Sequence, residues 1–292
     1  MRLREALASG KVVITAEVAP PKGTDLTAFR ESLPYLKGRV DAVNVTDFQS
    51  AVVRASSLTL CHLLLEEGLE PVLQITGRDR NRIAIQGELL GAAILGIENV
   101  LAITGDHTEI GDDPGAKPVF DLDAVTILQA AKSLSQGRDL AGNPLQGAPD
   151  FTLGATVTPC YEPLELQVLK MESKLAAGAT FFQTQAVYEV EVMRRFREAT
   201  AHLGDVKVLV GIIPLKSAGM ARFMNKNVPG IRVPEELIEG IEEAPDPVAA
   251  GVEAAGELMA ALLEEGLCDG FHLMTLGRED LVPGILAAAG LA

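Results

Sequence analysis

Eight short apolar runs rich in β-branched residues are spaced along the chain, and each stops abruptly at a polar segment. The stretches between successive stops carry apolar residues at helical spacing. This alternation predicts parallel strands, each followed by a helix, and in such folds the chemistry takes place where the strands end. The stops are Glu17, Thr46, Gln74, Thr104–Asp106, Thr158, Thr184–Gln185, Pro214–Lys216 and Thr275.

Eight strands alternating with helices are typical of an α/β fold, the (β/α)8 TIM barrel. An open doubly wound sheet alternates in the same way, but it normally carries GxGxxG after its first strand, and this chain has none there. No linker divides the sequence, so a single barrel domain over residues 1–292 is predicted. The predicted strands span residues 11–18, 41–46, 71–76, 99–104, 151–158, 179–185, 206–213 and 270–276. Helices are predicted at 25–37, 51–67, 79–95, 121–136, 162–177 and 189–203, with two or three more at 217–265.

Charge and composition narrow the classes of partner. The net charge of −15 would repel the phosphates of nucleic acids and of anionic membranes, so neither is expected as a partner. No run of about 18 apolar residues occurs, and the N-terminus lacks the apolar stretch of a signal peptide, so a cytoplasmic protein is expected. The three cysteines and four histidines are scattered, so no metal site is expected. The composition therefore favours an enzyme with small-molecule ligands.

Two acidic residues at strand ends are candidates for catalysis. Glu17 ends the first strand and is followed by Pro20 and Pro21, which restrain the loop. Asp106 follows Gly105, a residue type that lets the backbone approach a ligand closely. Two carboxyl groups at the same barrel mouth can be held in different ionisation states, as acid–base chemistry requires. From position alone, a solvated glutamate and a simple Gly-Asp turn are also compatible with these residues.

Other polar residues have both binding and structural interpretations. The amide of Gln185 can donate to and accept from the edge of a heterocycle, or it can cap a nearby helix. Lys174 lies in a final helical turn, where a lysine commonly compensates the helix dipole. The arginines after the third strand fit either a phosphate site or a solvated helix start, and they are Arg78, Arg80 and Arg82.

Taken together in order and spacing, the strand ends resemble segments of the methylenetetrahydrofolate reductase family. The matching segments are AEVAPPKG, DAVNVTD, ENVLAITGDH, KLAAGATFFQTQAVYE, VGIIP and FHLMTLGRE. The resemblance implies a (β/α)8 barrel that carries a flavin and reduces 5,10-methylenetetrahydrofolate to 5-methyltetrahydrofolate. It implies that Glu17 is the general acid, which protonates the folate as its five-membered ring opens to an iminium.

The resemblance also implies roles for the other strand-end residues. Asp106 would lie beside both the flavin and the pterin, where its charge favours the cationic iminium. Gln185 would bind the pterin edge, and Arg278 would meet the benzoyl-glutamate part of folate. The expected cofactor is FAD, with FMN as the alternative. The residues expected to hold it are Thr46, Gln74, Thr104, Gly105, Asp106 and Lys174.

Departures from the family pattern bear on the electron donor. Gln74 stands where relatives often have histidine, and Thr104 where they often have arginine. Ala218 stands where relatives that use a nicotinamide often have an aromatic residue. The donor is therefore expected to be either NADH or an iron–sulfur subunit, and a homo- or hetero-oligomer is expected. Two other functions are kept open: a pterin-binding methyltransferase barrel without flavin, and a flavin electron-relay subunit of a larger complex.

Overall fold

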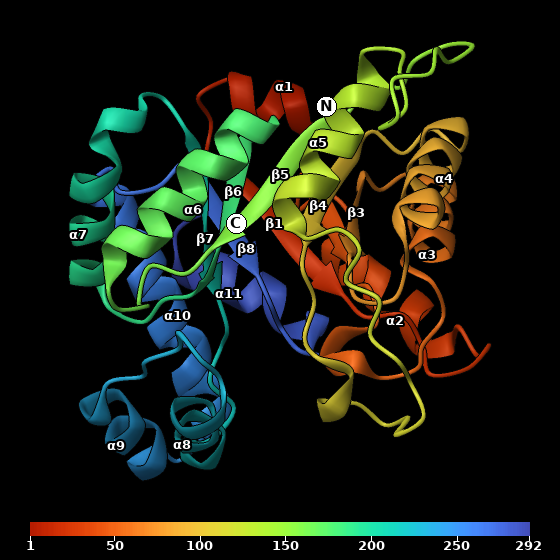
Figure 1. Ribbon diagram of the computed structural model, residues 1–292. Coiled ribbons are helices and arrows are strands. Elements are labelled where there is room, and N and C mark those ends of the chain that lie inside the picture. Colours follow the sequence, from red (N-terminus) through yellow and green to blue (C-terminus); the bar gives the residue numbers. More distant parts are fainter.

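The computed structural model describes residues 1–292. Its centre is a closed barrel of eight parallel strands in chain order, in which β8 pairs with β1 (Figure 1). The prediction of a (β/α)8 TIM barrel is therefore confirmed. The strands are β1 (Val13–Val18), β2 (Ala42–Val45), β3 (Pro71–Thr76), β4 (Asn99–Ile103), β5 (Thr152–Val157), β6 (Phe181–Ala186), β7 (Lys207–Ile212) and β8 (Gly270–Leu273).

The helices surround the barrel and follow the predicted alternation. One predicted boundary is wrong, because residues 52–56 are not helical and the helix begins at Ser57. The Ser56 side chain accepts the backbone N–H of Thr59 at 3.3 Å, which caps the helix at this later point. The surrounding helices are α2 (Thr27–Leu36), α3 (Ser57–Glu66), α4 (Arg82–Ile94), α5 (Ala124–Ser135), α6 (Leu164–Ala177), α7 (Val190–Thr200), α8 (Ala218–Asn227), α9 (Glu235–Glu243), α10 (Pro247–Glu264) and α11 (Val282–Ala288).

A short helix, α1 (Leu3–Ala8), precedes the first strand and was not predicted. It lies across the end of the barrel at the top of Figure 1. Leu3 and Ala6 are fully buried there, in one apolar cluster with the first inward residues of the strands. These are Val13, Ala42, Val72, Leu101, Phe181 and Leu209. The N-terminal end of the barrel is therefore closed by apolar side chains.

The opposite end of the barrel interior is polar. Thr15, Asn44, Gln183 and His272 are buried and hydrogen-bonded to one another in the middle of the barrel. Beyond β7, helices α8 and α9 project from this end and share a small apolar core of their own (Figure 1). None of the helices combines the length and the apolar character that a membrane crossing requires. Because the interior becomes polar toward the C-terminal ends of the strands, we expect the functional site at this end of the barrel.

Candidate active site

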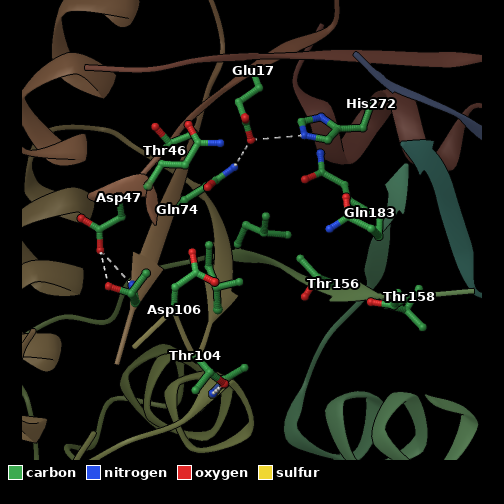
Figure 2. Close-up of a pocket in the computed structure, with 18 of the residues that line it drawn as sticks. Glu17, Thr46, Asp47, Gln74, Thr104, Asp106, Thr156, Thr158, Gln183 and His272 are labelled. Carbon is green, nitrogen blue, oxygen red and sulfur yellow. Dashed lines mark hydrogen bonds and ion pairs between the residues drawn. The ribbon is translucent and has the colours of Figure 1, made fainter. Parts of the chain in front are cut away.

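A pocket of about 390 Å³ lies at the C-terminal ends of the strands. It brings together eight of the residues predicted from the sequence, although they come from six different strand–helix units (Figure 2). Arg278 is not in the lining; its guanidinium group forms an ion pair with Asp280 at 2.8 Å. The predicted residues in the lining are Glu17, Thr46, Gln74, Thr104, Gly105, Asp106, Lys174 and Gln185.

Glu17 lies at one end of this pocket with its carboxyl group largely shielded, since its side chain is 12% exposed. The side-chain amide of Gln74 donates to Glu17 Oε2 at 2.9 Å. His272 Nε2 lies 3.6 Å from the same oxygen (Figure 2). One carboxylate oxygen therefore faces both an amide donor and an imidazole nitrogen. The hydrogen bond from Gln74 can hold the carboxyl group in place both before and after it gives up a proton.

The hydrogen bonds around His272 assign its tautomer. The Thr15 hydroxyl donates to the carbonyl of Phe271 at 3.3 Å, so the Thr15 oxygen is left to accept. His272 Nδ1 lies 2.9 Å from that oxygen and is therefore assigned as the protonated nitrogen. In the neutral imidazole this leaves Nε2 as an acceptor facing Glu17.

Two buried amides keep this arrangement rigid. Gln183 Nε2 donates to Thr15 Oγ1 and to Asn44 Oδ1, in both cases at 3.1 Å. Asn44 Nδ2 donates back to Gln183 Oε1 at 2.7 Å. Sequence reasoning did not single out Thr15, Asn44, Gln183 or His272 as site residues. A signal was present, because three of them stand two positions before a polar stop and so face the same interior.

Asp47, the residue after the second stop, was also missed, and it joins two loops at the rim. Its buried carboxylate receives two hydrogen bonds from Arg80, at 2.7 and 3.0 Å. The backbone N–H of Thr76 donates to the same carboxylate at 2.9 Å. Arg78 and Arg82 are likewise paired, with Asp79 and Asp121 respectively. The three arginines after β3 thus bind acidic residues of the protein itself, which favours the structural interpretation over the phosphate site.

Thr46 carries a polar group without a partner. Its Oγ1 is buried and makes no hydrogen bond, although the residue lines the pocket and is only 2% exposed. An unsatisfied buried hydroxyl is costly, and such groups in native proteins usually meet a ligand or an ordered water. The Thr46 hydroxyl is therefore free to form a hydrogen bond with a polar ligand atom in the pocket.

Gly105 lines the pocket on the side of β4. Its φ of +89° lies in the left-handed region that favours glycine. A Cβ atom here would come within 3.1 Å of Thr76 and 3.2 Å of Arg78 side-chain atoms. The neighbouring Asp106 is exposed, and its carboxylate makes no hydrogen bond within the protein; only its backbone carbonyl accepts one, from Arg78. Glycine at this position therefore allows close packing of the loop against Thr76 and Arg78, and Asp106 offers a ligand an unpaired negative charge.

Lys174 provides an unpaired cation on the opposite side of the pocket. Its Nζ donates to the carbonyl of Thr156 rather than to a carboxylate. Burial of the ammonium group lowers the pKa of Lys174 to about 8; Lys170 adds to this effect and Asp123 opposes it. A half-buried lysine with no acidic partner is poorly stabilised by the protein alone. An anionic ligand group would supply the negative charge that the Lys174 ammonium group does not find within the protein.

The end of β6 is irregular where Gln185 enters the pocket. The pairing of β6 with β7 shifts between Gln183 and Ala186, and the Thr184 hydroxyl accepts the N–H of Gly211 at 2.9 Å. Such irregularities re-aim a side chain next to a site. Gln185 Oε1 accepts the backbone N–H of Ala186 at 2.9 Å, so its amide N–H groups remain available to a ligand.

The methylenetetrahydrofolate reductase family model matches residues 2–290 of this sequence. The chain belongs to this family. The resemblance noted from the strand ends is thereby confirmed, and family membership supports an oxidoreductase that reduces methylenetetrahydrofolate.

Relatives of two lengths match the chain. A 5,10-methylenetetrahydrofolate reductase of Pectobacterium carotovorum is 24% identical over 306 residues, which cover 99% of this chain and 94% of the relative. A probable methylenetetrahydrofolate reductase (NADPH) of Caenorhabditis elegans is 24% identical over 248 residues. That match covers 83% of this chain but only 34% of the longer relative. The chain therefore corresponds to nearly all of the bacterial enzyme and to about a third of the nematode protein.

Among solved structures, an uncharacterized protein from Clostridium thermocellum superposes with a TM-score of 0.66 and 18% identity. The match covers 98% of this chain and 97% of the other. That protein binds two copies of 5-methyl-5,6,7,8-tetrahydrofolic acid. At this level of identity the likeness establishes a shared fold.

Proposed function

We propose that this chain catalyses the flavin-dependent reduction of 5,10-methylenetetrahydrofolate to 5-methyltetrahydrofolate, with Glu17 as the general acid. The observation that carries the proposal is the shielded Glu17 carboxyl group, held by Gln74 beside His272 at the end of a polar pocket. Family membership supports the substrate. The folate-binding fold neighbour from C. thermocellum is consistent with a reduced folate as ligand.

The residues of the pocket fit a flavin. The unpartnered Thr46 hydroxyl suits a polar ring atom, and Gly105 lines the same pocket. Lys174 has no acidic partner and suits a phosphate group. Gln74 and Thr104 complete the proposed set, with FAD or FMN as the cofactor. When bound, the flavin supplies the hydride that reduces the one-carbon unit.

Glu17 supplies the proton in this proposal. Its carboxyl proton passes to N10 of the folate, the C–N10 bond breaks, and the one-carbon unit remains on N5 as an iminium cation. The carboxylate that forms is held by the hydrogen bond from the Gln74 amide. The buried network behind His272 keeps the imidazole in this position, so little reorganisation is needed.

Asp106 and Gln185 act on the pterin side in this proposal. The unpaired Asp106 carboxylate would favour the cationic iminium electrostatically. The free amide N–H groups of Gln185 would bind the pterin edge. Neither Ala218 nor any other residue of α8 lines the pocket. The electron donor in this proposal is either NADH or an iron–sulfur subunit.

The test begins with protein reconstituted with FAD or FMN and reduced by light. Mixing with methylenetetrahydrofolate should reoxidise the flavin and yield one 5-methyltetrahydrofolate per flavin. Protein that binds reduced folate but no flavin would instead support the methyltransferase alternative. Flavin that binds but is not reoxidised by folate would support the electron-relay alternative. Adding NADH to the lone chain then separates the two donors.

A further inference from the structure

Helix α4 lies on the outside of the barrel, and the face that it turns away from the barrel is apolar (Figure 1). Its inner face is buried through Ile85, Leu89 and Ala92. A surface helix normally carries charged and polar side chains on its outer face, and a helix that is apolar all round is normally buried. The sequence of α4 therefore fits a helix that is covered on both faces. The outward residues of α4 are Ile83, Ala84, Gly87, Leu90, Gly91 and Ile94.

Two isoleucines of this face are more exposed than any other large apolar side chain of the chain. Ile83 is 76% exposed and Ile94 is 85% exposed. Helix α7 has the usual pattern instead, because its exposed positions carry Glu191, Arg195 and Glu198. Single exposed apolar residues are common, but apolar residues that gather on one face mark a contact surface. The outer face of α4 has this property.

A groove of about 550 Å³ runs beside the C-terminal half of α4. Leu90, Ala93 and Ile94 of the helix form one wall, and Leu145 and Phe151 of the segment before β5 contribute to the other. None of the residues that line this groove lines the active-site pocket. A protein bound at α4 would therefore leave the pocket open.

The charges beside the groove are neutralised within the chain. Glu98 forms an ion pair with Arg2 at 2.7 Å, and Asp150 forms one with Arg4 at 2.6 Å. Two chains that each carry a net charge of −15 repel one another, so they can associate only where no unpaired charge becomes buried. The outer face of α4 and its groove meet this condition.

We propose that this face binds a second copy of the chain, with the two α4 helices packed antiparallel about a two-fold axis. A two-fold contact requires a surface that is complementary to itself, so that each copy offers both a projection and a hollow. Ile83 is such a projection, and the groove beside Ile94 is such a hollow. The two isoleucines lie on the same face of α4, three turns apart or about 16 Å along the axis. An antiparallel partner therefore places each Ile83 at the groove of the other copy.

The middle of α4 allows the two helices to approach closely. Gly87 lies between the two isoleucines, and a Cβ atom at this position would have no atom of the chain within 4 Å. Glycine adds no side chain between the backbones there. The antiparallel arrangement also sets the positive N-terminal end of each α4 beside the negative C-terminal end of the other, which favours association.

The first test measures the mass of the protein in solution by sedimentation velocity and light scattering. The wild type should be a dimer or a larger even-numbered assembly at micromolar concentration, and Ile94→Arg should have half that mass. Its association should be weakened about 100-fold or more, as for loss of an apolar anchor at the centre of an interface. Leu169→Arg is the matched control, because Leu169 is 57% exposed on α6. It should retain the wild-type mass, and unchanged far-ultraviolet circular dichroism should show that both variants are folded.

The second test measures the direction of packing. Ile83→Cys and Ile94→Cys are purified separately, mixed to exchange subunits and oxidised. The mixture should form a disulfide-linked dimer, whereas either variant alone should form little more than the wild type, which controls for the three native cysteines.

Four results would overturn the proposal. A monomeric wild type would exclude a second copy and leave the face to a different protein. An unchanged mass in Ile94→Arg would place the contact elsewhere, and a lower mass in Leu169→Arg alone would move it to α6. Cross-linking of either single variant with itself, but not of the mixture, would refute the antiparallel arrangement.

Discussion

Lys174 is expected to lower the stability of the flavin-free protein. Its pKa falls from the usual 10.5 to about 8 because the ammonium group is buried. That difference corresponds to about 3 kcal/mol of destabilisation while the lysine is charged. Since the pKa in the folded state lies below the unfolded value, the destabilisation is fully present below pH 8. It fades as the pH rises from 8 to 10.5.

Replacing this lysine should therefore stabilise the protein at neutral pH. Lys174→Met removes the buried charge but also the hydrogen bond to the Thr156 carbonyl, which contributes about 1 kcal/mol. We expect a net gain of about 2 kcal/mol in the free energy of unfolding at pH 7, falling to about zero at pH 10. Urea unfolding of flavin-free protein, followed by circular dichroism at both pH values, measures this difference.

Lys132→Met is the matched control. Lys132 also donates to a backbone carbonyl, that of Ala176 at 3.2 Å, but its side chain is exposed. Its replacement should change the free energy of unfolding by less than about 0.5 kcal/mol. The reasoning is refuted if Lys174→Met is less stable than the wild type at pH 7, or if the difference between these two proteins is the same at pH 7 and pH 10.

Three further predictions concern the active-site pocket. Glu17→Gln should leave flavin affinity unchanged but slow the reoxidation of reduced flavin by methylenetetrahydrofolate about 100-fold or more, as measured by stopped-flow absorbance. A decrease in rate of only a few-fold would show that Glu17 is not the general acid. Thr46→Val should weaken flavin binding about 5- to 10-fold in fluorescence titrations without lowering the melting temperature of flavin-free protein, because its buried hydroxyl has no partner to lose. Asp106→Asn should raise the flavin midpoint potential in spectroelectrochemical titration, since it removes a negative charge from beside the ring; an unchanged potential would contradict the proposed position of Asp106.

Much of the site could be predicted because a parallel barrel gathers the ends of all its strands at one mouth. The polar stop of each strand is visible in the sequence as the end of an apolar run. Residues as distant as Glu17, Gln74 and Gln185 therefore had to converge once the barrel closed. Their roles toward flavin and folate stay predictions, for which the binding and kinetic experiments above are designed.

Other features depended on contacts that no local pattern encodes. Closure of the barrel pairs β1 with β8 and so brings His272 beside Glu17 from the opposite end of the chain. Side-chain direction decided the place of Arg278, because its guanidinium group pairs with Asp280 outside the pocket lining. Helix α1 was not predicted for a related reason. Its few apolar residues form a core contact only because they pack against the open N-terminal end of the barrel.

The sequence by itself determined the order of strands and helices and the set of polar residues at the strand ends, because both follow from the periodicity of apolar side chains along a single chain. The tertiary structure alone decided which of those residues touch and which charges remain unpaired. It also decided that Glu17 is shielded beside His272 in the pocket. Those properties arise from distances between strands and loops far apart in the sequence, and these distances are set only when the barrel closes and its loops pack.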